Sequence, residues 1–140
     1  MNYEPEKIIL DVDDDQYICE FLTTVLEKAG FRVATALNGE LALKIVRSGK
    51  IDLILLDWMM PVLSGFEVLK ELQKNEYRTI PVIVITATST DKSVIGTIKH
   101  EMNVVDFMHK PLNHKILLAR VREILKRNPN PRTKRPKNSG

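Results

Sequence analysis

Residues 8–15 read IILDVDDD and residues 53–57 read LILLD. Each stretch is a short apolar run that ends in carboxylate, with Asp13, Asp14 and Asp15 after the first and Asp57 at the end of the second. Unbroken apolar runs of this length are typical of strands that are buried on both faces of a parallel sheet. In open parallel sheets, ligands bind beyond the carboxyl ends of the strands, where loops from neighbouring strands converge. The two stretches therefore predict a fold class and the edge of the sheet at which a site would lie.

Five apolar, β-branched runs alternate with segments of helical periodicity, which predicts a doubly wound α/β domain with a parallel sheet. The expected strands are residues 8–13, 32–36, 53–57, 82–86 and 104–108. Five helices are expected: one closed by Gly30, one from Asn38 to Gly49, one opened by a capping box at Ser64 and Glu67, one at about residues 92–102, and one from Asn113 that stops before Pro129. The fourth helix is the least clearly patterned.

Length and composition limit the classes to which the protein can belong. With 140 residues, 44% of them apolar and 28% charged, the chain fits one globular domain with a sizeable core. No apolar run approaches the roughly 20 residues that cross a bilayer, and the first residues lack the basic and apolar parts of a signal peptide. A cytoplasmic protein with no membrane partner is expected. Cys19 is the only cysteine, which excludes an internal disulfide and a cysteine-based zinc site.

The net charge of +3 is unevenly distributed along the chain. Residues 126–140 hold six of the 21 basic residues and no acidic residue, so residues 1–125 hold 15 basic residues against 18 acidic ones. We expect residues 1–127 to form the domain and residues 128–140, rich in proline and basic residues, to form a linker or disordered tail. Electrostatic contact of this tail with nucleic acid is the alternative. Without interleaved aromatic residues or a recognition helix, we expect no nucleic-acid binding by the domain itself.

The clustered carboxylates can be explained in two ways. Aspartate favours the N-cap and first turn of a helix, so residues 13–15 could simply cap the helix that follows. Several carboxylates at one edge of a sheet would instead repel each other and raise their own pKa values unless a cation lay among them. Mg2+ is the divalent ion that suits such oxygen ligands. Placing the residues on their strands brings a wider set to one rim: Asp13, Asp14, Asp57, Thr86 and Lys110.

Four segments together carry a resemblance to a known family. They are residues 9–15 (ILDVDDD), residues 57–65 (DWMMPVLSG), residues 81–87 (PVIVITA) and residues 107–111 (FMHKP). In order and spacing they closely resemble the receiver domain of bacterial two-component response regulators, of the chemotaxis-regulator type, over residues 7 to about 127. The resemblance implies a flavodoxin-like fold, with a five-stranded parallel sheet of order 2-1-3-4-5 flanked by five helices.

The resemblance also implies a reaction. Asp57 would accept a phosphoryl group from the phosphohistidine of a sensor histidine kinase or a phosphotransfer protein, in a Mg2+-dependent step. Asp14 and Asp57 would ligate Mg2+ directly, Asp13 would act largely through water, and the backbone carbonyl of Met59 would complete the protein ligands. Lys110 would neutralise phosphoryl oxygens. Such a domain is a signalling switch and not an enzyme, although it assists its own phosphorylation and dephosphorylation.

Further residues would transmit the signal in a protein of this kind. The hydroxyl of Thr86 would bond to the phosphoryl group, Phe107 would rotate into the space that Thr86 vacates, and the surface of the fourth helix, fifth strand and fifth helix would change. A homodimer, an output domain or a partner protein would use this surface. The resemblance also predicts a cis Lys110–Pro111 bond, and it places Met59 and Thr88 at the positions that tune dephosphorylation.

Two departures from the family pattern and two rival hypotheses stand beside this interpretation. Asp11 occupies a position where the family has an aliphatic residue, so a buried charge there needs a partner or a shifted pKa. Asn103 replaces the usual glycine before the last strand, a change that left-handed backbone geometry would allow. In a haloacid-dehalogenase-like phosphohydrolase, Asp11 would be the nucleophile and Asp13 the acid/base, but residues 57–65 would have no role. The last hypothesis is a receiver fold that does not use phosphorylation, against which the complete acidic set argues.

Overall fold

The computed structural model describes residues 6–74, 76–87, 96, 98, 100 and 103–127. Within these ranges lies a five-stranded parallel sheet of order β2-β1-β3-β4-β5. Its strands are β1 (Ile8–Val12), β2 (Arg32–Ala36), β3 (Leu53–Asp57), β4 (Val82–Thr86) and β5 (Val104–His109). The predicted sheet and strand order are confirmed, and each strand end lies within one residue of its expected place.

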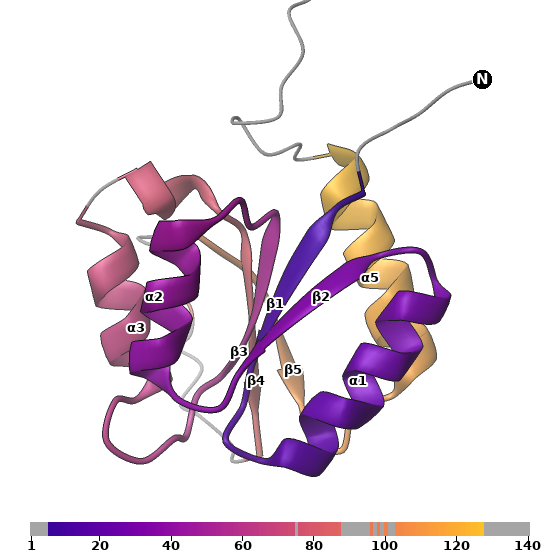
Figure 1. Ribbon diagram of the computed structural model, residues 1–140, viewed down its shortest axis with the longest axis horizontal. Helices are drawn as coiled ribbons and strands as arrows, with labels where there is room; N and C mark the ends of the chain where they lie inside the picture. The colour runs from indigo at the N-terminus through magenta and orange to yellow at the C-terminus, as the bar shows by residue number, and fades with distance from the viewer. Residues whose placement is uncertain are drawn as a thin grey trace, which may run out of the picture.

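Helices cover both faces of the sheet (Figure 1), with α2 and α3 on one side and α1 and α5 on the other. Within the described ranges the α-helices are α1 (Gln16–Lys28), α2 (Gly39–Ser48), α3 (Gly65–Leu72) and α5 (His114–Arg127), with a short 3-10 turn, η1 (Glu76–Thr79). The expected fourth helix falls mostly outside the described residues. Its residues Gly96, Ile98 and His100 are helical, and Ile98 packs in the core on the α2 and α3 side.

The sequence signals at helix ends act as predicted. Asp15 caps α1, because its carboxylate accepts hydrogen bonds from two backbone amides of the first turn. Asn38 caps α2, and Ser64 and Glu67 form the expected capping box of α3. Gly30 has φ +98° after α1, a left-handed conformation that glycine adopts without strain. Within the acidic run, helix capping therefore falls to Asp15, which leaves the two preceding carboxylates for another role.

Each face of the sheet has its own apolar core, one beneath α2 and α3 and the other beneath α1 and α5. Every residue of β3 and β4 is buried, as expected for central strands covered on both faces. The central strands are thus held firmly, and the residues at their carboxyl ends have fixed positions. In the part of the chain that the structure describes, no helix combines the length and apolar character that a membrane crossing needs.

Asn103, which stands where the family has a glycine, is held by its side chain. The Asn103 side chain accepts a hydrogen bond from Gln73 Nε2 at 2.7 Å and donates one to the carbonyl of Ile80. These two bonds tie the end of α3 and the segment before β4 to the start of β5. The side-chain amide therefore gives asparagine a structural role at this position.

Candidate functional site

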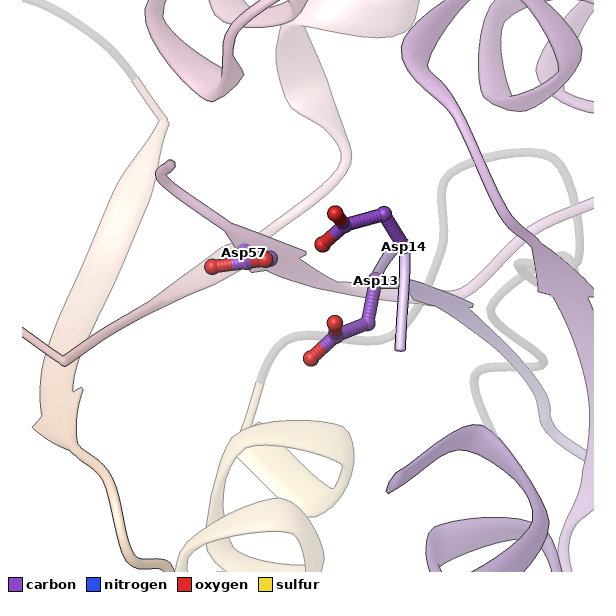
Figure 2. A group of neighbouring side chains, drawn as sticks. All are labelled: Asp13, Asp14 and Asp57. Carbon is purple, nitrogen blue, oxygen red and sulfur yellow. The ribbon is translucent and has the colours of Figure 1, made fainter. Parts of the chain in front are cut away.

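The carboxyl ends of the adjacent strands β1 and β3 bring three carboxylates together. Asp13 and Asp14 follow β1, Asp57 ends β3, and the side-chain oxygens of the three lie within 4.8 Å of one another. Figure 2 shows the carboxylates of Asp13 and Asp14 projecting toward the side on which Asp57 lies. Asp13 is 2% exposed and Asp57 is 3% exposed, whereas Asp14 is exposed. This carboxylate cluster is therefore open to solvent mainly along Asp14.

Lys110, in the loop after β5, supplies a positive charge to the carboxylate cluster. Its Nζ lies 3.0 Å from Asp13 Oδ2 and 3.6 Å from Asp57 Oδ2. Its backbone amide donates to the carbonyl of Thr86 at 2.9 Å, and its bond to Pro111 is cis, as predicted. Burial acts to lower the pKa of Lys110, but hydrogen bonds and charges of Asp13 and Asp57 outweigh it and raise that pKa. The lysine thus links the ends of β1, β3 and β5.

Hydrogen bonds hold the two buried carboxylates unequally. Asp13 Oδ1 accepts the amide of Asp15 at 2.9 Å, and Asp13 Oδ2 pairs with Lys110 at 3.0 Å. The contacts of Asp57 are longer, 3.3 Å from the amide of Met59 and 3.6 Å from Lys110. Burial and the charge of Asp13 raise the pKa of Asp57 to about 6, against the opposing effect of Lys110. Asp57 is therefore the more loosely held of the two carboxylates.

The donor set of the carboxylate cluster fits a hard divalent cation. Three carboxylates face one lysine, so the charge of the cluster is only partly neutralised by the protein. The raised pKa of Asp57 has the repulsion from Asp13 as its second cause after burial, and a cation would remove that repulsion. Mg2+ prefers oxygen ligands and is commonly held by one or two carboxylates. Met59 follows the cluster in the loop, with its side chain 59% exposed.

The two predicted switch residues lie on the neighbouring strands β4 and β5. Thr86 ends β4 at the same rim as Asp57 and is 1% exposed. Phe107 lies opposite Val84 in β5, half-buried, and packs against the core on the α2 and α3 side. Thr88, expected to tune dephosphorylation, falls outside the described residues. The predicted site residues that the structure describes therefore lie at the carboxyl ends of the strands, except Phe107, which lies within β5.

The loop between β3 and α3 packs closely against the backbone at the end of β3. A Cβ atom on Gly65 would lie 2.7 Å from the carbonyl oxygen of Asp57 and 2.9 Å from Cα of Trp58, so no larger residue fits. Val62 in the same loop has φ +69° and an 88% exposed side chain. This conformation is an outlier for a β-branched residue. Nothing in the sequence pattern pointed to it.

Asp11 lies in β1 outside the carboxylate cluster and is 1% exposed. Its Oδ2 is buried and has no hydrogen-bond partner. Burial, followed by the charge of Asp13, raises the pKa of Asp11 to about 7, which confirms the expected shift. The neighbouring thiol of Cys19 donates to the carbonyl of Asp13 at 3.4 Å, and burial raises its pKa to about 12. Burial and the nearby charge of Asp13 therefore favour the neutral form of Asp11.

An apolar hollow adjoins Lys110 between α1 and the loop after β5. Its volume is about 460 Å³. Tyr17 and Phe21 of α1 are 81% and 50% exposed, although both carry large apolar rings. Exposed apolar groups of this size beside a polar site are typical of contact surfaces. The hollow is lined by Ile18, Phe21, Leu22, Lys110, Pro111 and Leu112.

Known proteins are similar to this chain over most of its length. The family model of the response regulator receiver domain matches residues 9–122. The transcriptional regulatory protein CpxR homolog of Haemophilus influenzae is 44% identical over 124 residues, which are 88% of this chain and 52% of that protein. The phosphate regulon transcriptional regulatory protein PhoB of Pseudomonas aeruginosa is 37% identical over 122 residues, 86% of this chain and 52% of that protein. The chain spans about half the length of these relatives.

Solved structures show the same fold over nearly their whole length. The receiver domain of Francisella response regulator 1452 has a TM-score of 0.78 and 33% identity, covering 87% of this chain and 98% of that one. The response regulator TrrA of Thermotoga maritima, in complex with Mg2+ and BeF, has a TM-score of 0.70 and 34% identity, covering 85% and 99%. Together with the matching family model and the site geometry, these likenesses show that the chain belongs to the response regulator receiver domain family.

Proposed function

We propose that Asp57 accepts a phosphoryl group from the phosphohistidine of a sensor histidine kinase or a phosphotransfer protein. One observation carries the proposal: of the two buried carboxylates in the cluster, Asp13 and Asp57, Asp57 is the one held by long contacts. Its oxygens lie 3.3 and 3.6 Å from their partners, against 2.9 and 3.0 Å for Asp13. A nucleophile needs an oxygen lone pair that is not strongly committed elsewhere, and Asp57 retains one.

The transfer itself needs little from the protein beyond positioning and charge. One carboxylate oxygen of Asp57 attacks phosphorus, and the P–N bond to the imidazole breaks with its electron pair going to nitrogen. Lys110 lies 3.6 Å from Asp57 Oδ2, within reach of the phosphoryl oxygens that would form there. The hydroxyl of Thr86, at the same rim, would bond to another of these oxygens. Receiver domains are signalling switches rather than turnover enzymes, and we propose that these residues assist both phosphorylation and dephosphorylation.

We place the required Mg2+ at the carboxylate cluster. Asp14 and Asp57 would ligate it directly, Asp13 largely through water, and the backbone carbonyl of Met59 would be the remaining protein ligand. When bound, Mg2+ neutralises the carboxylates and the charge that develops on the phosphoryl oxygens. The clustering of three carboxylate oxygens within 4.8 Å and the raised pKa of Asp57 support this placement.

We further propose that phosphorylation moves Thr86 toward the phosphoryl group and Phe107 into the space it leaves. The expected fourth helix, at about residues 92–102, would complete the responding surface together with β5 and α5. The helical conformation of Gly96, Ile98 and His100 supports this helix. The surface is the proposed contact for a homodimer, an output domain or a partner protein.

The remaining features of the chain are proposals of the same kind. A phosphodonor protein must contact this domain at the carboxyl ends of the strands, where Asp57 lies. The exposed rings of Tyr17 and Phe21 in α1 suit such a contact with another protein. We propose that residues 1–127 form the receiver domain, that residues 128–140 are a basic linker or tail, and that the domain itself binds neither membrane nor nucleic acid. A cytoplasmic location follows from the proposed phosphodonors, which draw their phosphoryl groups from cytoplasmic ATP.

The phosphohydrolase hypothesis receives no support from the comparisons. Its nucleophile, Asp11, lies outside the carboxylate cluster and is 1% exposed. Its acid/base, Asp13, has both oxygens engaged at 3.0 Å or less. Residues 57–65 lie within the match to the receiver family model and would have no role in that hypothesis.

Incubation with acetyl phosphate and Mg2+, followed by mass spectrometry, tests the proposal. We expect one phosphoryl group per chain, located on the peptide that contains Asp57, and none in Asp57→Asn. Asp15→Asn is the matched control, because asparagine also caps helices well and the acidic run is otherwise kept. This control should be phosphorylated like the wild type. Equal labelling of Asp57→Asn, or label on the peptide that contains Asp11, would overturn the assignment.

A further inference from the structure

A β-bulge lies in β5 just before the proposed switch residue Phe107. Val82 pairs with Val104, but the next residue of β4, Ile83, pairs with Asp106, so Val105 is an extra residue in β5. Bulges bend a strand and re-aim the side chains that follow. β5 is also an edge strand of the sheet. The backbone groups of this segment that face away from β4 therefore have no neighbouring strand to pair with.

Two side chains bind backbone groups of β5 beside the bulge. Asp106 Oδ1 accepts the amide of Phe107 at 2.8 Å, and Arg120 Nη2 of α5 donates to the carbonyl of Val105 at 3.2 Å. Arg120 Nε also donates to Asp106 Oδ2 at 2.7 Å, and its Nη1 donates to Glu123 at 2.7 Å. Arg120 and Asp106, called the clasp below, thus join α5 to the backbone of β5 on both sides of Asp106.

The clasp is strong enough to restrain the backbone that it covers. Its bonds join a guanidinium to carboxylates, and charge-assisted bonds of this kind are roughly twice as strong as neutral ones. Arg120 and Asp106 are 29% and 27% exposed, so solvent weakens the pair only in part. The hydrogen bond to Asp106 is the main cause of the raised pKa of Arg120. The clasp makes two bonds to the backbone of β5, one at the carbonyl of Val105 and one at the amide of Phe107. Asp106 lies between these two residues.

We propose that the clasp of Arg120 and Asp106 holds Phe107 in its unphosphorylated arrangement, which makes Arg120 a positioning residue of the switch. The inference rests on the proposed function, because it assumes that Phe107 moves on phosphorylation. A restraint that favours one of two states lowers the affinity of any ligand that needs the other. Loss of the clasp should therefore favour the phosphorylated arrangement. Because Arg120 and Glu123 also line a hollow of about 510 Å³ on α5, a partner there would act on the same restraint.

Binding of beryllofluoride in the presence of Mg2+, which mimics the phosphoryl group, tests the clasp. Arg120→Met removes the guanidinium and keeps most of the apolar stem. We expect its beryllofluoride affinity to rise about three- to tenfold, the range for losing one or two part-exposed charged bonds. Arg120→Lys should give an intermediate value. Arg122→Met is the matched control, since Arg122 is exposed on the same helix and outside the clasp. It should bind like the wild type.

A second measurement separates positioning from a merely structural role. Amide hydrogen exchange at Phe107 in the unphosphorylated protein should be faster in Arg120→Met than in Arg122→Met, and the free energy of unfolding should fall only slightly. Equal or weaker beryllofluoride binding by Arg120→Met, with the wild type still binding, would overturn the clasp alone. Failure of the wild type to bind beryllofluoride would overturn the proposed function and, with it, the clasp.

Discussion

Replacing Asp11 with leucine should stabilise the fold, by an amount that depends on pH. Asp11 is 1% exposed in β1, and one of its carboxylate oxygens is buried without a hydrogen-bond partner. Burial, with the charge of Asp13, raises its pKa from an ordinary value of 3.8 to about 7. Above this pKa the folded protein must hold a buried charge, because the hydrogen bond with Cys19 and the charge of Lys110 do not outweigh burial. A leucine side chain carries no charge.

The magnitude follows from the pKa difference. A tenfold change in proton affinity corresponds to about 1.4 kcal/mol, so ionised Asp11 opposes folding by about 4 kcal/mol. The folded pKa is the higher one. The wild type therefore binds more protons when folded, and its stability is lost as the pH rises from about 4 through about 7. Burial of the leucine side chain adds about 2 kcal/mol, and crowding in the core offsets an amount of similar size. The net gain should be small at about pH 4 and about 4 kcal/mol at about pH 8.

Urea unfolding in EDTA, followed by circular dichroism at several pH values, measures this gain. Asp11→Asn is the control, since it removes the ionisation and keeps the shape. The stability of Asp11→Asn should also depend less on pH than that of the wild type. Its gain in the free energy of unfolding should be smaller than that of Asp11→Leu, because a buried amide still needs hydrogen bonds. A gain from Asp11→Leu that is the same at about pH 4 and about pH 8 would refute the reasoning. So would a loss of stability at about pH 8.

Three further results are expected. Mg2+ should raise the melting temperature more at about pH 8 than at about pH 5, because the pKa of Asp57 is raised to about 6 and the metal needs its ionised form. Asp14→Ala should abolish this rise, and an equal rise at both pH values would contradict the prediction. Cys19, 3% exposed and with its pKa raised to about 12, should react with thiol reagents only at urea concentrations that unfold the chain, so rapid labelling of the native protein would disprove its burial. Val62→Gly should raise the free energy of unfolding by about 1 kcal/mol by relieving the left-handed strain, whereas Val62→Ile should not.

The parts of the fold that the sequence predicted depend on local patterns. Strand positions follow from apolar runs, and the ends of the helices follow from single capping residues such as Asn38 and Ser64. The gathering of Asp13, Asp57, Thr86 and Lys110 could also be predicted, because parallel strands end at one edge of a sheet. In each case the signal lies within a few residues of the feature, so the printed sequence is enough to find it.

The features that escaped prediction depend on contacts between distant residues. The positive φ of Val62 arises in the loop between β3 and α3, and a valine in the sequence does not indicate it. Asn103 is accommodated by Gln73, 30 positions away in the chain. The bond between Asp106 and Arg120 needs the bulge in β5 and the packing of α5 together. The distances from Lys110 to Asp13 and to Asp57 differ, and this difference likewise depends on where the lysine side chain lies in the folded protein.

Lys110 acts as a tethered counter-ion for the carboxylates at the sheet edge. Its Nζ lies 3.0 Å from Asp13 and 3.6 Å from Asp57, so Mg2+ would meet ligands that are already arranged, and little reorganisation would accompany its binding. The same positive charge would compete with the metal, so affinity should stay modest and occupancy should follow the concentration of free Mg2+. If the proposed phosphoryl group drew the lysine away, the carboxylates would be left to the metal alone. One side chain would then make metal binding readily reversible in the unphosphorylated protein and tighter after phosphorylation.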